Sequence, residues 1–294
     1  MLEKASCCKV NLLLNILGKR ADGFHELETV LHPVPLCDQL SFEREGAGIQ
    51  LSCSNPSLPV NSSNLIVQAA GLFAKAGGLG PNEAISIHLR KNIPVAAGLG
   101  GGSGNAAVTL LALNELFGHP LPAAKLQELA AALGSDVPFF LQTGPALATG
   151  RGEIVRPLDG FSAMRGACFV LVHPGFGIST PWAYQQLANF PAAVAGTPGR
   201  AGRLIALLQT SLAAASPEFF NSLEAPVLRK YPLLELFQEF FRENGASATL
   251  MSGSGSATFA LAPARDAAEA MLERFKVKFG TDIWAAVVPS LSQT

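Results

Sequence analysis

One glycine-rich stretch, residues 94–107, constrains this chain more than any other part of its sequence. It reads Pro-Val-Ala-Ala-Gly-Leu-Gly-Gly-Gly-Ser-Gly-Asn-Ala-Ala and connects a β-like segment at 84–89 to an Ala/Leu-rich segment at 106–117 that predicts a helix. Glycines let the backbone turn sharply and aim several N–H groups at one point, and the start of a helix adds unpaired amides. The pattern therefore predicts a site for a di- or triphosphate.

Other interpretations of this stretch fit less well. A flexible linker is normally polar on both sides, whereas these flanks are apolar and regular. The stretch lacks the Lys-Ser/Thr ending of a Walker A loop, and no acidic residue ends a second strand at the spacing of a dinucleotide-binding fold. Both common nucleotide-binding folds are therefore disfavoured.

Composition favours a protein that handles a small molecule. The chain has 294 residues, of which 49% are apolar and 15% charged, with a formal net charge of −1. This length suits one large domain or two of ordinary size. So small a net charge gives no field that would attract nucleic acid or an anionic membrane, so a bound phosphate must be held locally. We expect neither nucleic acid nor a membrane as a partner.

The cysteines and the N-terminus indicate a cytoplasmic protein. The cysteines are odd in number and lack the Cys-x-x-Cys spacing of zinc or redox sites, so we expect reduced, mostly buried thiols. The apolar run at 10–17 is interrupted by Asn11 and Asn15, which is poor for a signal peptide. No apolar run approaches the ~20 residues needed to span a bilayer.

Residues 7–17 predict a β-strand on which Lys9, Asn11 and Leu13 point one way and the apolar residues between them point the other. A lysine and an asparagine on one face of an otherwise apolar strand need a polar partner, because an unpaired buried ammonium is costly. An edge strand with its polar face in water is the alternative.

Two further segments carry candidate functional residues. Phe24 and His25 end a turn-rich loop at 18–25, where they could fill the core or face a ligand. Asp136 precedes Val-Pro-Phe-Phe at an expected helix start, so it could be a simple N-cap as well as a functional carboxylate.

The last third of the chain alternates expected helices with expected strands. The helices are predicted at 201–214, 226–244 and 264–279, and the strands at 248–251, 257–262 and 283–288. A small-residue turn at 252–256, Ser-Gly-Ser-Gly-Ser, is either an ordinary hairpin or a loop that closes over phosphates. We place a domain boundary near 159–165 and the most mobile stretch at 192–202.

Three separated motifs occur in one order: Lys9-Val-Asn-Leu, then Pro94-x-x-x-Gly-Leu-Gly-Gly-Gly-Ser, then Ser252-Gly-Ser-Gly-Ser. Together they resemble the GHMP kinase superfamily, named for galactose, homoserine, mevalonate and phosphomevalonate. Two further segments, Gly-Lys-Arg-Ala-Asp-Gly-Phe-His-Glu-Leu at 18–27 and Gly-Ser-Asp-Val-Pro-Phe-Phe at 134–140, resemble its members that act on a cytidine diphosphate derivative of methylerythritol. The resemblance runs over nearly the whole chain.

This resemblance implies a two-domain α/β (α+β) fold. Residues 1–160 would form an ATP-binding N-terminal domain like ribosomal S5 domain 2, and residues 161–294 a ferredoxin-like C-terminal domain. The implied reaction is ATP-dependent phosphorylation of the substrate's 2-hydroxyl in the non-mevalonate isoprenoid pathway, by direct transfer with Mg²⁺. The expected form is a monomer or a weak homodimer.

The resemblance also implies roles for individual residues. Asp136 would be the catalytic base, and Lys9 would be its partner and keep the carboxylate ionised. Contacts to ATP are implied at Asn64, Lys91, Pro94, Gly98, Leu99, Gly100, Gly101, Gly102 and Ser103. Contacts to the substrate are implied at Asn11, Phe24, His25, Thr180 and Tyr184. Phe24 and Tyr184 would stack on the cytosine. The metal ligands stay open, with Ser103 as one candidate.

The chain departs from the family pattern at three places. Ser6-Cys7-Cys8 replaces the usual Ala-Pro-Ala, Phe24 replaces a tyrosine, and Gly104 replaces a second serine. Phe24 keeps the stacking ring but loses a hydroxyl. Gly104 removes a possible phosphate or magnesium ligand, so Ser103 would carry that role alone.

Three alternative functions differ in what they need from the sequence. A related kinase for mevalonate or homoserine would have no base to stack, which the implied aromatic pair and His25 disfavour. A nucleotide-binding protein without catalysis would not need both Lys9 and Asp136. An ATP-dependent decarboxylase would need a pocket for a carboxylated diphosphate, of which the loop at 24–25 gives no sign.

Overall fold

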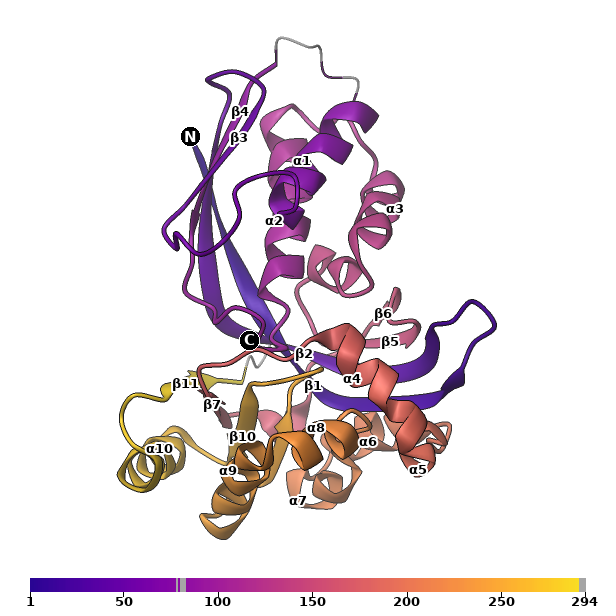
Figure 1. Cartoon of the computed structure of the whole chain (residues 1–294), viewed down its shortest axis with the longest axis vertical. Coiled ribbons are helices and arrows are strands. Elements are labelled where there is room, and N and C mark those ends of the chain that lie inside the picture. The colour runs from indigo at the N-terminus through magenta and orange to yellow at the C-terminus, as the bar shows by residue number, and fades with distance from the viewer. Residues whose placement is uncertain (78, 80–82, 291–294) are drawn as a thin grey trace. The chain divides into compact units, whose positions relative to one another are not determined.

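A computed structural model describes residues 1–77, 79 and 83–290 of the chain (Figure 1). The chain forms two compact units, each built from several segments. Unit 1 comprises Met1–Cys8, Leu36–Pro94 and Gly100–Thr143, and unit 2 comprises Lys9–Pro35, Val95–Leu99 and Gly144–Thr294. The boundary between family domains at residues 160 and 161 stays a prediction.

Two long strands, β1 (Leu2–Lys19) and β2 (His25–Glu43), contribute residues to both units. The expected strand at 7–17 is thus a longer one. β2 is one continuous strand, although Pro33 and Pro35 interrupt its apolar pattern. Val34 lies between them and is fully buried, so packing keeps this part of the chain extended.

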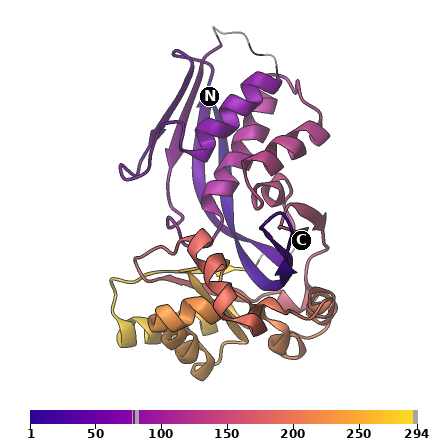
Figure 2. The ribbon, with the colours of Figure 1, turned by 45° about the vertical axis from the view of Figure 1, so that its right-hand side comes forward.

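In unit 1, helices cover a sheet in which β3 pairs with β4 in parallel and β4 pairs with β2 antiparallel. Figures 1 and 2 both show its three helices on one side of β3 and β4. The elements of this unit that follow β2 are β3 (Ile49–Cys53), α1 (Leu65–Ala76), β4 (Ile85–Arg90), α2 (Gly101–Leu116), α3 (Ala123–Leu133) and the 3-10 helix η1 (Val137–Leu141).

The core of unit 1 follows from the helical spacing of its apolar residues. In α1, Ile66, Ala69, Ala70 and Phe73 recur on one face and are buried. They pack in one cluster with apolar side chains of α2, α3 and the strands. The helix that the sequence predicts at 106–117 is confirmed as part of α2.

Unit 2 contains a four-stranded antiparallel sheet of order β11-β7-β10-β9. Its strands are β7 (Cys168–His173), β9 (Ala248–Met251), β10 (Thr258–Ala262) and β11 (Trp284–Pro289). Numbered along the chain, their order in the sheet is 4-1-3-2, with helices between the first and second strands and between the third and fourth. This is the ferredoxin-like arrangement that the family resemblance implies.

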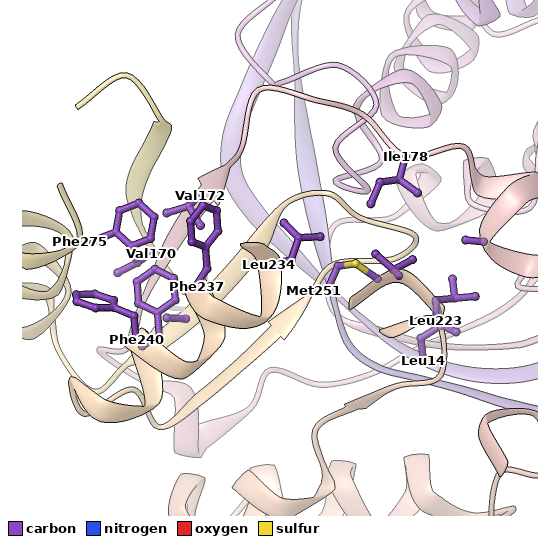
Figure 3. Packing of buried hydrophobic residues seen from close by; sticks show 14 of the residues in the cluster. Leu14, Val170, Val172, Ile178, Leu223, Leu234, Phe237, Phe240, Met251 and Phe275 are labelled. Carbon is purple, nitrogen blue, oxygen red and sulfur yellow. The ribbon is translucent and has the colours of Figure 1, made fainter. Parts of the chain in front are cut away.

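Two amphipathic helices, α9 (Pro232–Glu243) and α10 (Arg265–Phe279), bury one face of this sheet. Figure 3 shows Phe237 and Phe240 of α9 beside Phe275 of α10 and the valines of β7. Every residue of β7 and β10 is buried, which explains why these strands are apolar without alternation except at His173 and Thr258.

The remaining elements of unit 2 correct two sequence expectations. The helix expected at 226–244 is interrupted before Pro232, which starts a new helix, and the one expected at 201–214 is interrupted at Gln209. The elements of unit 2 outside the four-stranded sheet and its two covering helices are β5 (Ala146–Gly150), β6 (Ile154–Pro157), η2 (Ser162–Met164), α4 (Thr180–Gln186), η3 (Leu187–Asn189), α5 (Pro191–Val194), α6 (Arg200–Leu208), α7 (Leu212–Ala215), η4 (Ser216–Glu218), β8 (Phe220–Asn221) and α8 (Glu224–Lys230).

In the described part of the chain, no helix is both long and apolar enough to span a bilayer.

Cys7 and Cys37 form a disulfide, so the expectation that all the thiols are reduced is wrong for this pair. The two cysteines lie on β1 and β2, which are neighbours in the sheet. Sequence spacing alone cannot reveal this, because it does not show which strands pair. Cys8, Cys53 and Cys168 are free thiols, and Cys53 is the one that is partly exposed.

Candidate active site

The glycine-rich stretch and the small-residue turn at 252–256 meet in unit 2. Gly98 has a φ of +76°, and a Cβ atom at this position would lie 2.1 Å from the carbonyl oxygen of Ser252. The Ser252 hydroxyl donates a 3.0 Å hydrogen bond to the Gly98 carbonyl. Only glycine combines this backbone conformation with so close an approach. The turn at 252–256, which connects the paired strands β9 and β10, therefore also contacts the glycine-rich stretch.

Lys9 of β1 joins the same contact. Its ammonium donates to the Gly98 carbonyl at 2.7 Å and to Asn11 Oδ1 at 2.6 Å, and its backbone N–H donates to the Leu99 carbonyl at 3.0 Å. Lys9 and Asn11 are 2% and 3% exposed, so the alternative of an edge strand with its polar face in water is wrong. The predicted need for a polar partner is confirmed, and the three sequence motifs converge on one carbonyl group.

Asn221 holds the backbone of the turn at 252–256 through its side-chain amide. Its amide donates to the Met251 carbonyl at 2.8 Å and to the Gly253 carbonyl at 2.7 Å. The carboxylate of Glu224 accepts from the Met251 N–H at 2.7 Å. Burial raises the pKa of Glu224 to about 7, against the opposing effect of its hydrogen bonds.

Thr180, expected to contact the substrate, lies at the first position of α4 and hydrogen-bonds Ser254 at 2.7 Å between the two hydroxyls. Ser179 caps this helix by accepting from the Trp182 N–H. Thr180 thus belongs to the same cluster as Lys9 and the Ser252–Ser256 turn.

The aromatic residues expected to hold a base lie in unit 2. The rings of His25 and Tyr184 are 5.4 Å apart, and burial and the charge of Lys19 lower the pKa of His25. Phe24 is 51% exposed, with the Arg151 guanidinium 4.6 Å above its ring. An exposed ring with a cation on one face is available for stacking on the other. Stacking of a base between Phe24 and Tyr184 stays a prediction.

In unit 1, α2 presents an N-terminus suited to an anion. The helix begins at Gly101, earlier than the sequence pattern predicts, because Gly100 with a φ of +74° turns the chain into it. Among the described residues, no side chain caps this helix. Gly101, Gly102 and Ser103 form its first turn, where backbone N–H groups point out of the helix. The residues of this turn therefore fit a bound phosphate.

Lys91, expected to contact ATP, takes part in a buried ion pair. Its ammonium lies 2.9 Å from Asp38 Oδ2, and the side chain is 7% exposed. Asp38 also accepts from the backbone N–H groups of Asn92 and Ile93 and from the amide of Asn105. This network connects the segment before the glycine-rich stretch to α2. A contact of Lys91 with ATP stays a prediction.

The other expected residues of unit 1 lie at element ends. Asn64 caps α1 by accepting from the Ile66 N–H at 2.9 Å. Asp136 precedes η1 and does not cap it, so the simple N-cap interpretation does not describe this residue. Pro94 ends the middle segment of unit 1. In the ranges 1–77, 79 and 83–290, no group of three His, Cys, Asp or Glu side chains could hold a metal ion.

Sequence reasoning missed several residues that position these groups. Thr29 accepts from the Asn11 amide at 2.9 Å, and Asp38 anchors Lys91. Both are polar residues buried in a strand, at 5% and 0% exposure. Such residues usually have a specific partner, but their burial is visible in the structure and not in the sequence.

Comparisons with known proteins agree with this geometry. The family models described as GHMP kinases N terminal domain and GHMP kinases C terminal match residues 64–144 and 189–280. The 4-diphosphocytidyl-2-C-methyl-D-erythritol kinase of Synechococcus sp. (strain JA-3-3Ab) is 41% identical over 261 residues, which cover 86% of this chain and 82% of the relative.

Two solved structures extend the likeness to the fold. A crystal structure of 4-(cytidine 5'-diphospho)-2C-methyl-D-erythritol kinase matches with a TM-score of 0.78 and 33% identity, covering 98% of this chain and 99% of the other. A homoserine kinase from Cytophaga hutchinsonii matches with a TM-score of 0.74 at 20% identity, covering 98% and 96%, which shows the fold alone. The chain therefore belongs to the GHMP kinase family, in the group of its 4-diphosphocytidyl-2-C-methyl-D-erythritol kinases.

Proposed function

We propose that this chain transfers the γ-phosphoryl group of ATP to the 2-hydroxyl of 4-diphosphocytidyl-2-C-methyl-D-erythritol. The proposal is supported by the names of relatives that match over most of its length, with 41% identity in one case. The observation that carries the proposal is that Lys9 and Ser252 both donate to the carbonyl oxygen of Gly98. These hydrogen bonds join the three motifs of a kinase family in one cluster.

Phosphoryl transfer needs a positioned hydroxyl, a group that accepts its proton and neutralisation of phosphate charge. In the proposal, Asp136 accepts the proton, and Lys9 keeps this carboxylate ionised and oriented. The first turn of α2 and the residues from Gly98 to Gly100 bind the ATP phosphates. Asn64, Lys91 and Pro94 contribute to the nucleotide site.

The same proposal assigns the substrate to residues of unit 2. Asn11, His25 and Thr180 hydrogen-bond it, and Phe24 and Tyr184 bind the cytosine ring. Ring faces supply affinity for any base, so the choice of cytosine falls to hydrogen bonds at the edge of the base.

Mg²⁺ bound to the ATP phosphates would neutralise their charge. The described residues lack a carboxylate cluster for a metal, which suits an ion held by phosphate oxygens and water with few protein ligands. Ser103 is the proposed protein ligand, since its hydroxyl is in the first turn of α2. We further propose that the enzyme works in the cytoplasm as a monomer or weak homodimer.

ATP consumption by the purified protein tests the function. The assay compares the cytidyl substrate with mevalonate and homoserine under the same conditions. We expect turnover with the cytidyl substrate alone. Turnover with mevalonate or homoserine would assign the chain to another kinase of the same fold, and ATP binding without any turnover would point to a protein that has lost catalysis.

A further inference from the structure

Thr29 of β2 lies behind Asn11 in a chain of hydrogen bonds that ends at Lys9. The Thr29 hydroxyl donates to the Leu13 carbonyl at 2.5 Å and accepts from Asn11 Nδ2 at 2.9 Å. Asn11 Oδ1 then accepts from the Lys9 ammonium at 2.6 Å. All these residues belong to unit 2 and are buried, with Thr29 5% exposed.

The chemistry of the two ends fixes the direction of every bond between them. A carbonyl oxygen can only accept, so the one proton of the Thr29 hydroxyl goes to Leu13. The hydroxyl therefore has only lone pairs left for Asn11, which must present its NH₂ group to Thr29. An ammonium can only donate, so Asn11 must present its oxygen to Lys9, and the same amide orientation satisfies both demands.

We propose that Thr29 is a positioning residue for phosphoryl transfer, which orients the Asn11 amide and through it holds the Lys9 ammonium in place. This inference rests on the proposed function, in which Lys9 and Asn11 serve the reaction. Without the Thr29 hydroxyl, the buried NH₂ group of Asn11 would lose its Thr29 acceptor, and only Lys9 would still select the orientation of the amide. The Asn11 side chain would then be held less firmly, and a flipped amide would turn its NH₂ group toward the ammonium, where two donors repel each other.

A purely structural role for Thr29 makes a different prediction. In that case the hydroxyl only satisfies the Leu13 carbonyl of β1, and removing it lowers stability without a specific effect on turnover. Three variants separate the two roles. Thr29→Val keeps the shape of the side chain and removes the hydroxyl, whereas Thr29→Ser keeps the hydroxyl and removes the methyl group. The control is Thr109→Val, which removes another buried threonine hydroxyl. That hydroxyl donates to the Asn105 carbonyl of its own helix at 2.7 Å.

The first readout is steady-state kinetics with ATP and the cytidyl substrate. For Thr29→Val we expect kcat to fall about 10- to 100-fold, since a small misplacement of a group in the active site has effects of this size. KM should change far less, Thr29→Ser should restore kcat to near the wild-type value, and Thr109→Val should leave it there.

The second readout does not depend on turnover. Side-chain ammonium signals of ¹⁵N-lysine-labelled protein are recorded by NMR, with Lys9→Met used to assign the Lys9 signal. A buried, hydrogen-bonded ammonium exchanges its protons slowly, so the signal should be seen in the wild type and Thr29→Ser and be lost or shifted in Thr29→Val.

The outcomes distinguish the inference from the proposed function. An unchanged Lys9 signal and an unchanged kcat in Thr29→Val overturn the inference, as does a Thr29→Ser variant that is as impaired as Thr29→Val. If the wild type shows no turnover but the ammonium signal depends on the Thr29 hydroxyl, the positioning role stands and the proposed function fails.

Discussion

The hydroxyl oxygen of Ser6 lies 3.0 Å from the point that a Cβ atom at Gly104 would occupy. Ser6 is 1% exposed, and its hydroxyl has no hydrogen-bond partner in the described part of the chain. Two of the three departures from the family pattern thus share one small space in unit 1. A side chain at 104 requires Ser6 to move, and its Cβ atom would also lie 3.3 Å from the carbonyl oxygen of Cys7.

This relationship predicts that substitutions at 6 and 104 are not additive. Gly104→Ser alone should lower the free energy of unfolding by about 1–3 kcal/mol, the usual cost of overpacking. Adding Ser6→Ala should recover part of this loss, giving a coupling energy of about 0.5–3 kcal/mol in a double-mutant cycle. Urea denaturation of the wild type, both single variants and the double variant measures it, and simple additivity would contradict the contact.

Gly98→Ala should impair the protein severely. The added methyl group would lie 2.1 Å from the Ser252 carbonyl oxygen, and the residue would also need a left-handed backbone. We expect a loss of stability of more than about 3 kcal/mol, or no folded protein.

Gly71→Ala in α1 is the matched control, because nothing lies within 4 Å of its Cβ position. It should gain up to about 1 kcal/mol from helix propensity. Equal effects of the two substitutions in thermal denaturation would rule out the steric explanation.

These contacts separate the features that the sequence predicts from those that it does not. The glycines predict a sharp turn at the start of a helix, and the lysine on an apolar strand predicts a buried polar partner, because both are local demands of the chain. The partners themselves, such as Gly98 for Lys9 and Asp38 for Lys91, come from residues 89 and 53 positions away in the sequence. Only the fold of the whole chain brings these residues together, because Gly98 and Lys91 lie outside the strands. Thr29 was missed because one threonine in a strand carries no periodic signal.

The disulfide between Cys7 and Cys37 should stabilise the protein measurably. It closes a loop with a sequence separation of 30, for which chain entropy gives about 3–4 kcal/mol. A dithiol reductant should therefore lower the urea midpoint of the wild type. It should have no effect on a Cys7→Ser/Cys37→Ser variant, whereas Cys53→Ser, which removes a free thiol, should respond as the wild type does. If the urea midpoint of the wild type is the same with and without the reductant, the result contradicts the disulfide.

Asp136→Asn should leave ATP binding largely intact and lower kcat by about 10²- to 10⁴-fold, as expected for removal of a general base. Asparagine keeps the size of the side chain but cannot accept a proton. Nucleotide binding by calorimetry and turnover by coupled assay separate the two effects. Turnover at the wild-type rate would refute the assignment of the base.

Stability should fall with rising pH because of Glu224. Burial raises its pKa from 4.5 to about 7, so between these values the folded state binds more protons than the unfolded state. The free energy of unfolding therefore decreases as pH rises through this range, by up to about 3 kcal/mol. Glu224→Gln, which is neutral throughout, should be more stable than the wild type at pH 8 and lose this advantage near pH 4.5. The exposed Glu239→Gln is the control, and a difference that does not vary with pH would contradict the assignment.

The disulfide also makes a closed covalent ring of residues 7–37. The ring contains Lys9, Asn11 and Thr29 and the exposed loop tip at 21–23. A protease that cuts this tip opens the ring but releases nothing, because Cys7 and Cys37 still connect the two sides of the cut. The tip is therefore a place where the chain can accept new termini or an inserted peptide while the Lys9 strand stays attached to the rest of the enzyme.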